Sequence, residues 1–137
     1  IDGVMLTSAE QWMMASKATL FDDLTAARAI LGTDDPAEQK RLGQSVKGFD
    51  QAVWDHWKIS IVYRGNLAKF AQNEGAARQL KATGRAMLVE ANPRDWVWGI
   101  GLAIGDPAVH THSEWKGSNL LGRILTKVRT DLGLNGT

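Results

Sequence analysis

The stretch 91–117 constrains the fold of this 137-residue chain more than any other feature. Glycine and proline recur in it too often for a long helix or strand to form. A loop of about 27 residues inside a small domain is usually either functional or disordered. Disorder fits poorly here, because the loop holds three tryptophans, Trp96, Trp98 and Trp115. We therefore expect an ordered loop that faces a ligand and is held between regular elements.

Helical spacing of apolar residues, together with capping residues, predicts helices on both sides of this loop. Thr7 is expected to cap the first helix, with Glu10 completing a capping box. Gly65 is expected to break or bend the fourth helix. The predicted helices cover about 8–21, 24–31, a segment that starts at Asp35-Pro36, 50–73, 76–83 and 120–132.

The segment Ala86-Met87-Leu88-Val89 is the best candidate for a β-strand, because it is short, apolar and β-branched at its end. The length fits one compact domain, and no repeat, linker or low-complexity segment divides the sequence. We therefore predict the α+β class, with a single domain over residues 1–137 that is mostly helical and carries a small β-sheet.

Composition excludes several classes of protein. Cysteine is absent, which excludes disulfides, thiolate metal sites and cysteine nucleophiles. The net charge of +1 excludes a strongly cationic nucleic-acid binder, although a local basic groove is compatible with it. The apolar runs are shorter than the ~18 residues that a membrane-spanning helix needs, so no membrane association is expected. The expected setting is the reducing cytoplasm.

Two charged side chains of the first predicted helix are candidates for chemistry. Glu10 and Lys17 are seven residues apart, almost two helical turns, so they project from nearly one face. Nearby methionine and phenylalanine side chains can partly desolvate Lys17, which lowers the pKa of its amine and favours attack on carbon. The alternative is that both charged groups are solvated, with the lysine stem lying over apolar surface.

A second acidic pair, Glu90 and Asp95, flanks Asn92-Pro93. Paired carboxylates suit general acid–base catalysis at a glycosidic bond. The same residues are equally typical of a strand-end cap and a turn-forming aspartate.

Two further features are candidates for ligand binding. The segment Gly117-Ser118-Asn119 precedes the last predicted helix, and N–H groups at a helix start bind phosphate well. The alternative is an ordinary helix cap. His110 and His112 alternate and can share a metal on a strand, but a third ligand is lacking, so we expect no metal site.

Several separated motifs resemble, in the same order, those of the NADAR (YbiA-like) family. The matching segments extend over nearly the whole chain: Thr7–Ala18, Lys69-Phe70 with Asn73, Leu88–Glu90, Asp95 with Trp98-Gly99, and Trp115–Gly122. The family's upstream Leu-Ser-Asn-Phe segment would precede Ile1. We therefore expect the substrate contacts of that segment to be missing from this chain.

The resemblance implies hydrolysis of an N-glycosidic bond, without a metal or organic cofactor. Family members act on ADP-ribose attached to guanine, or on phosphorylated ribosylamino-pyrimidine intermediates of riboflavin synthesis. We predict the first activity, an ADP-ribosyl glycohydrolase acting on guanine bases of DNA or RNA. The second activity is the alternative, and a non-catalytic ADP-ribose-binding module is a further one.

The resemblance also assigns roles to residues. Lys17 matches the lysine that forms a Schiff base with the opened ribose, and Glu10 matches a helix carboxylate. Trp98 or Trp115 is expected to stack on guanine, and the 117–119 turn with Arg123 to take a phosphate. The expected ligand is ADP-ribose or a related ribosyl nucleotide, free or on single-stranded DNA or RNA. The expected substrate-binding residues are Glu90, Asp95, Trp98, Gly99, Trp115, Gly117 and Asn119.

Overall fold

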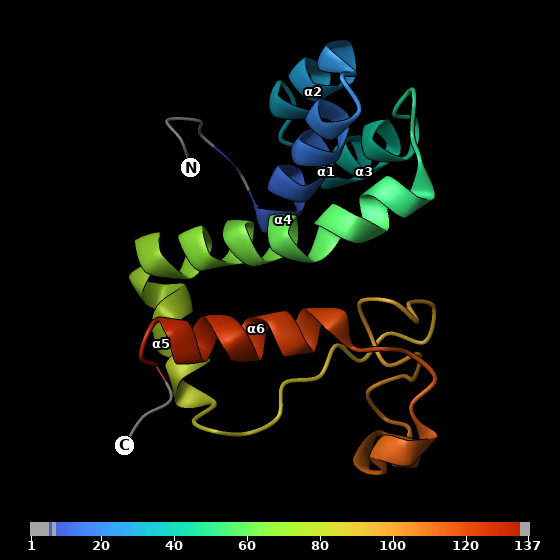
Figure 1. Ribbon diagram of the computed structural model, residues 1–137. Coiled ribbons are helices and arrows are strands. Elements are labelled where there is room, and N and C mark those ends of the chain that lie inside the picture. Colours follow the sequence, from blue (N-terminus) through green and yellow to red (C-terminus); the bar gives the residue numbers. More distant parts are fainter. Residues whose placement is uncertain (1–5, 7, 135–137) are drawn as a thin grey trace. The chain divides into compact units, whose positions relative to one another are not determined.

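The computed structural model describes residue 6 and residues 8–134, which form two compact units. Unit 1 extends to Gln72, and unit 2 begins at Asn73. Figure 1 shows the helices of both. Unit 1 contains α1 (Ala9–Leu20), α2 (Leu24–Leu31), α3 (Pro36–Gln44) and α4 (Gln51–Gln72).

The first three helices of unit 1 begin where a capping side chain accepts a hydrogen bond. The Ser8 hydroxyl accepts from the Gln11 N–H at 3.0 Å and so caps α1. The predicted cap, Thr7, lies outside the described residues. Asp23 and Asp35 cap α2 and α3 in the same way, and both helix starts are as predicted.

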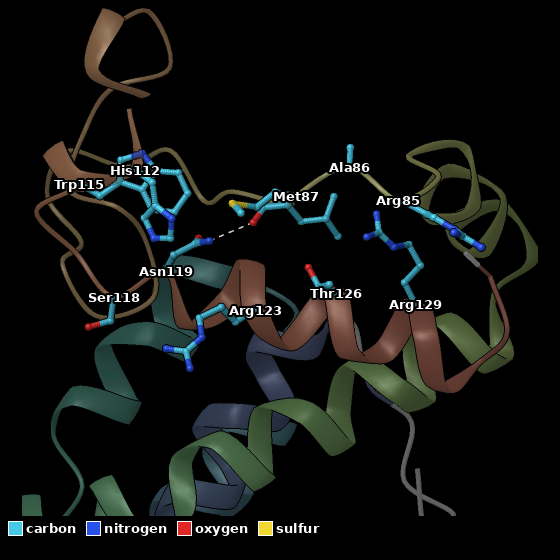
Figure 2. A pocket seen from close by; sticks show the side chains of 11 residues that line it. Arg85, Ala86, Met87, His112, Trp115, Ser118, Asn119, Arg123, Thr126 and Arg129 are labelled. Carbon is cyan, nitrogen blue, oxygen red and sulfur yellow. Dashed lines mark hydrogen bonds between the residues drawn. The ribbon is translucent and has the colours of Figure 1, made fainter. Parts of the chain in front are cut away.

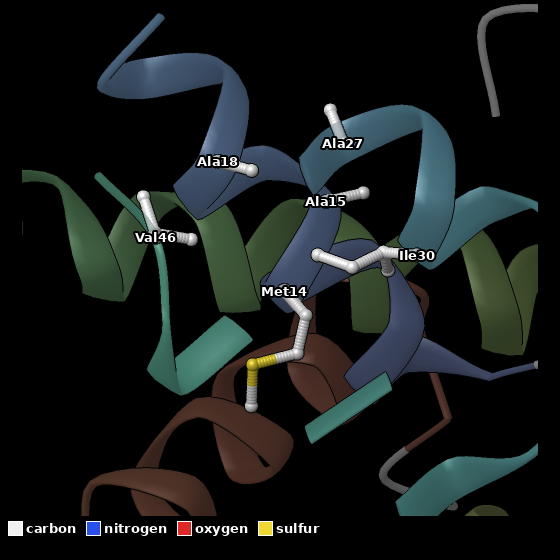
Figure 3. Close-up of a cluster of buried hydrophobic side chains, with 6 residues drawn as sticks. All are labelled: Met14, Ala15, Ala18, Ala27, Ile30 and Val46. Carbon is white, nitrogen blue, oxygen red and sulfur yellow. The ribbon is translucent and has the colours of Figure 1, made fainter. Parts of the chain in front are cut away.

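A small apolar core joins α1, α2 and the segment after α3. Figure 3 shows its six buried side chains, Met14, Ala15, Ala18, Ala27, Ile30 and Val46. Three of the six are alanines, and their small side chains allow α1 and α2 to approach closely. The buried Gln11 amide donates to the carbonyls of Ile30 and Thr33 at 3.0 and 3.3 Å, so the side-chain nitrogen of this buried polar residue is hydrogen-bonded.

The predicted break at Gly65 is wrong, because α4 runs without interruption past this residue. A Cβ atom at position 65 would collide with the indole ring of Trp12. That indole N–H donates to the Ile61 carbonyl at 2.8 Å, one turn earlier in α4. The glycine therefore serves close packing of α1 against α4.

Over its described residues, unit 2 contains two α-helices and two short 3-10 helices. A segment without regular structure, 84–90, leaves the end of α5 and runs alongside α6 (Figure 1). Asn73 caps α5, so this helix begins two residues earlier than predicted. The elements are α5 (Glu74–Ala82), η1 (Pro107–His110), η2 (His112–Glu114) and α6 (Leu120–Asp131).

The predicted strand 86–89 and its β-sheet are wrong: the described residues are helical or irregular and include no strand. The reason lies in the partners of this segment's backbone groups. The Asn119 side chain donates to the Leu88 carbonyl at 3.0 Å and accepts from the Glu90 N–H at 2.9 Å. One amide side chain thus takes the place that a neighbouring strand would have at these two backbone groups. The fold is helical rather than α+β.

The tryptophan-rich loop is ordered by backbone hydrogen bonds between two of its own segments. The N–H groups of residues 116–121 donate to the carbonyls of residues 96–100, at 2.8 to 3.1 Å. A Cβ atom on Gly117 would collide with the Gly99 carbonyl and approach the backbone of Trp96. The two segments can therefore lie this close only because glycine stands at position 117.

Candidate active site

Lys17 lies on the last turn of α1 with its amine beside two aromatic rings. Its Nζ is 4.7 Å from the centroid of the Phe49 ring and 5.7 Å from that of Trp54. Phe21 packs edge-on against Phe49, with ring centroids 5.3 Å apart. This partial burial lowers the pKa of the Lys17 amine below its ordinary value of 10.5.

The groups that desolvate Lys17 are only partly those that sequence analysis indicated. Met14 is instead buried in the core of unit 1, and Met13 packs against that core. Phe49 and Trp54, which contact the amine, were missed as site residues. No local sequence signal links them to Lys17, since more than thirty positions separate each from it.

Glu10 lies in the first turn of α1, where its carboxylate is exposed to solvent. Seven residues of helix rise by about 10 Å, so Glu10 and Lys17 lie on nearly one face but not in contact. A negative charge in the first turn also interacts favourably with the helix dipole. Unit 1 thus holds both predicted catalytic residues.

The acidic pair of unit 2 is engaged with the backbone. The Asp95 carboxylate accepts hydrogen bonds from the N–H groups of Val97 and Trp98, at 3.0 and 2.8 Å. This is the turn-forming role that sequence analysis left open for Asp95. Glu90 is half-buried, and its backbone is fixed by Asn119 and by the Ile100 N–H, which donates to its carbonyl at 3.0 Å.

The turn before α6 differs from the expected phosphate cradle. Gly117, Ser118 and Asn119 donate their N–H groups to the carbonyls of Ile100, Trp96 and Gly99, so these groups are engaged within the loop. Asn119 has a positive φ of 52° and is only 3% exposed. Its side chain holds the segment before Glu90 instead of capping α6.

The two tryptophans predicted to stack on a base lie in different surroundings. Trp115 is fixed by its indole N–H, which donates to the Val109 carbonyl at 3.0 Å, and its ring packs against His112 at 4.3 Å. Trp98 is half-buried in the loop next to the turn that Asp95 stabilises.

A pocket of about 530 Å³ lies within unit 2, between α6 and the segment 85–88. Figure 2 shows its lining side chains. Trp115 and Asn119 are the predicted substrate-binding residues that line it, and the predicted phosphate contact Arg123 lines it as well. Sequence analysis did not single out several of its other lining residues: Ala86, Met87, Thr126 and Arg129.

Two further sequence features were tested by the structure. His110 and His112 lie in the 3-10 helices η1 and η2 rather than on a strand. Over the described residues, no group of three metal-ligating side chains comes together.

No helix within the described residues is both long enough and apolar enough to cross a membrane.

Comparison with known proteins gives consistent matches over most of the chain. The family model of the NADAR domain matches residues 1–133. N-glycosidase R617 of Acanthamoeba polyphaga mimivirus is 41% identical over 124 residues, covering 90% of this chain and 73% of that protein. Protein irg-1 of Caenorhabditis elegans is 38% identical over 128 residues, 92% of this chain and 60% of that protein. A riboflavin biosynthesis protein of Vibrio vulnificus is 30% identical over 132 residues, 96% of this chain and 32% of that protein.

Proposed function

The chain belongs to the NADAR domain family, as its motifs predicted, and from that premise we propose that it removes ADP-ribose from guanine bases of DNA or RNA. The predicted enzyme class, an N-glycosidase, is the one named for the mimivirus relative. The observation that carries the proposal is the Lys17 amine beside Phe49 and Trp54. Because burial lowers the pKa of this amine, a larger fraction of it is neutral and nucleophilic near pH 7.

In the proposed reaction, the carbon attacked is C1′ of the ribose attached to guanine. When the ribose ring opens, the proton of the guanine N–H passes to the ring oxygen, which leaves an imine between C1′ and the guanine nitrogen. The Lys17 amine adds to C1′ and its two protons pass to the guanine nitrogen. The bond between C1′ and that nitrogen then breaks, so guanine leaves with a free amino group and an imine remains between Nζ and C1′. Water hydrolyses this imine, releases the aldehyde form of ADP-ribose and restores the amine. The covalent step divides one difficult reaction into two easier ones.

The remaining predicted residues take supporting roles in this proposal. Glu10 is assigned to proton transfer, because its exposed carboxylate shares a helix face with Lys17. Glu90 is assigned to the developing positive charge on the sugar, and Asn119 holds its backbone in place. Asp95, Gly99 and Gly117 shape the loop that carries Trp98 and Trp115.

The direct test is incubation of the protein with a single-stranded oligonucleotide that carries ADP-ribose on one guanine. We expect free ADP-ribose and unmodified oligonucleotide, detected by mass spectrometry. The Lys17→Ala variant, at the same concentration, serves as the control and should release neither. If the modified oligonucleotide stays intact at a stoichiometric amount of wild-type protein, the proposal is contradicted. If the protein binds this oligonucleotide without releasing ADP-ribose, the result favours an ADP-ribose-binding module.

The second candidate function is cleavage of a phosphorylated ribosylamino-pyrimidine. It is favoured by the likeness to the riboflavin biosynthesis protein of Vibrio vulnificus. The two substrates share the ribosyl C–N bond, so the same lysine chemistry applies to both. Comparing kcat/KM for the two substrates decides between them, and we expect the ADP-ribosylated guanine to give the higher value.

A further inference from the structure

The pocket of unit 2 has two chemically different ends. Figure 2 shows Arg85 and Arg129 near one end and His112 and Trp115 at the other, with Met87 between them. All of these residues belong to unit 2, so the arrangement does not depend on unit 1. The volume of about 530 Å³ is within the range of about 300–1,000 Å³ that is usual for small-molecule sites.

The arginine end suits an anion. Arg129 projects from α6, is only 3% exposed, and is oriented by a hydrogen bond from its Nη1 to the Thr83 hydroxyl at 2.8 Å. Arg85 is exposed and forms no ion pair within the described residues. None of the described residues that line the pocket carries a carboxylate. Guanidinium groups bind phosphate oxygens with charge-assisted, geometrically matched hydrogen bonds.

The aromatic end suits a planar ring. The Trp115 indole is held by its bond to the Val109 carbonyl and by the His112 ring, so little side-chain entropy is lost when a ligand stacks on it. Met87 is 64% exposed and offers a flexible apolar contact beside this surface. A base that stacks here needs no specific hydrogen bonds, because every base has a π-face.

From these two ends we infer that the pocket binds a nucleoside phosphate, with its phosphates at Arg85 and Arg129 and its base on Trp115. The inference rests on the proposed function, since ADP-ribose contains a nucleoside diphosphate. It goes further in assigning this part of the substrate to the pocket within unit 2.

The test is calorimetric titration of the whole chain with ADP, adenosine and ribose 5-phosphate. A site that uses both ends binds ADP at least tenfold more tightly than either of the other two. Adenosine lacks the phosphates, and ribose 5-phosphate lacks the base. Ribose 5-phosphate binding as tightly as ADP would show that the aromatic end is not used and would overturn the inference.

A pair of arginine variants tests the location. Arg85→Gln removes one exposed guanidinium from the pocket and should weaken ADP binding at least tenfold. Arg78→Gln removes an exposed guanidinium of α5 that does not line the pocket, and it should leave ADP binding within twofold of wild type. Equal effects of the two substitutions would mean that only general charge attraction is involved, and the pocket would not be the site.

The failure of this inference can be told from failure of the proposed function. If the wild type releases ADP-ribose from guanine but Arg85→Gln and Arg78→Gln bind ADP alike, the pocket assignment is wrong and the activity stands. If ADP binds as described but no ADP-ribose is released, the pocket assignment stands and the activity is wrong. Lys17→Ala should bind ADP as tightly as wild type does, because Lys17 does not line the pocket.

Discussion

At the scale of single residues, the surroundings of Lys17 act on its amine in opposite directions. Removal of water by the neighbouring side chains disfavours the ammonium form. The faces of the Phe49 and Trp54 rings attract a cation, which is worth about 0.5–1 kcal/mol at an exposed site. Burial lowers the pKa of Lys17, which raises the fraction of neutral amine.

We expect Lys17→Ala to abolish turnover while the helix content stays that of wild type. Alanine is the best helix former, so α1 loses only the amine. Steady-state kinetics and thermal unfolding followed by circular dichroism are the measurements. Lys40→Ala, at an exposed position of α3, is the control and should keep wild-type kcat. If the kcat of Lys17→Ala exceeds roughly a tenth of the wild-type value, the activation barrier has risen by less than about 1.4 kcal/mol, and Lys17 is not the nucleophile.

The Phe49 ring gives a prediction about pH. A reaction that needs the neutral amine becomes faster as pH rises through the pKa of Lys17, which lies below 10.5 in the folded protein. Phe49→Ala admits water to the amine, so the pKa should return toward 10.5 and the rising limb of the pH–rate profile should move to higher pH. Phe49 is 40% exposed, so the fold should tolerate this change.

The matched control for Phe49→Ala is Trp57→Ala, which removes another exposed ring of unit 1. Its pH–rate profile should coincide with that of wild type. If the rising limb of the Phe49→Ala pH–rate profile moves to lower pH instead, the cation–π attraction has a larger effect on the pKa of this amine than desolvation has.

At the scale of elements, the loop depends on two closely apposed backbone segments. Gly117→Ala would force a methyl group against the Gly99 carbonyl and the Trp96 backbone, neither of which can rotate away. We expect this substitution to lower the free energy of unfolding by about 1–3 kcal/mol, measured by urea denaturation. Gly105→Ala, where a methyl group would meet nothing within 4 Å, is the control and should unfold as wild type does.

Asn119 connects the start of α6 to the segment before Glu90. Asn119→Asp keeps the acceptor for the Glu90 N–H but replaces the donor to the Leu88 carbonyl with an oxygen. Because the site is buried, we expect a loss of about 1–3 kcal/mol in the free energy of unfolding. Asn92→Asp is the control, since there the side chain only accepts, from the Arg94 N–H.

If Asn119→Asp unfolds like wild type but no longer binds ADP, the residue contacts the ligand directly. That outcome would support the role implied by the family resemblance rather than the clamp described above.

Sequence predicted the helices well because their signals are local. Asp23 and Asp35 place helix starts, and Gly32 follows the last residue of α2, as expected. Local signals could not decide whether 86–89 forms a strand, because the sequence of a short apolar segment does not show whether its backbone pairs with a strand or with the Asn119 side chain. The break at Gly65 was wrongly predicted for a similar reason, since the role of this glycine depends on Trp12, more than fifty positions away.

The candidate site shows the same limit. Motifs predicted Lys17 and Trp115 as site residues, whereas no motif indicated Phe49 or Arg129. Contacts between residues far apart in sequence leave no periodic pattern, so only the three-dimensional structure reveals which ring covers the amine or which arginine reaches the pocket.

At the scale of the whole molecule, the net charge of +1 limits how the protein can hold nucleic acid. Each phosphate neutralised on a single strand contributes about −0.7 to the slope of log K against log salt concentration. Contact with two or three phosphates therefore predicts a slope near −2 for a modified single strand. The target base must also leave its stack before a small pocket can take its ribose, which favours single strands over duplex.

Binding of modified single strand and modified duplex across a salt series measures both effects. A slope steeper than about −5, or a preference for duplex, would contradict this account and indicate an extended basic surface.

The most direct test of the central claim is to add borohydride while the protein turns over ADP-ribosylated guanine, and to map any adduct by peptide mass spectrometry. Borohydride reduces an imine to a stable amine, so the ribosyl group should be found on the peptide that contains Lys17. The Lys17→Ala protein should show no adduct. Product formation with no adduct in the wild type, or with the adduct on a different lysine, would contradict the account.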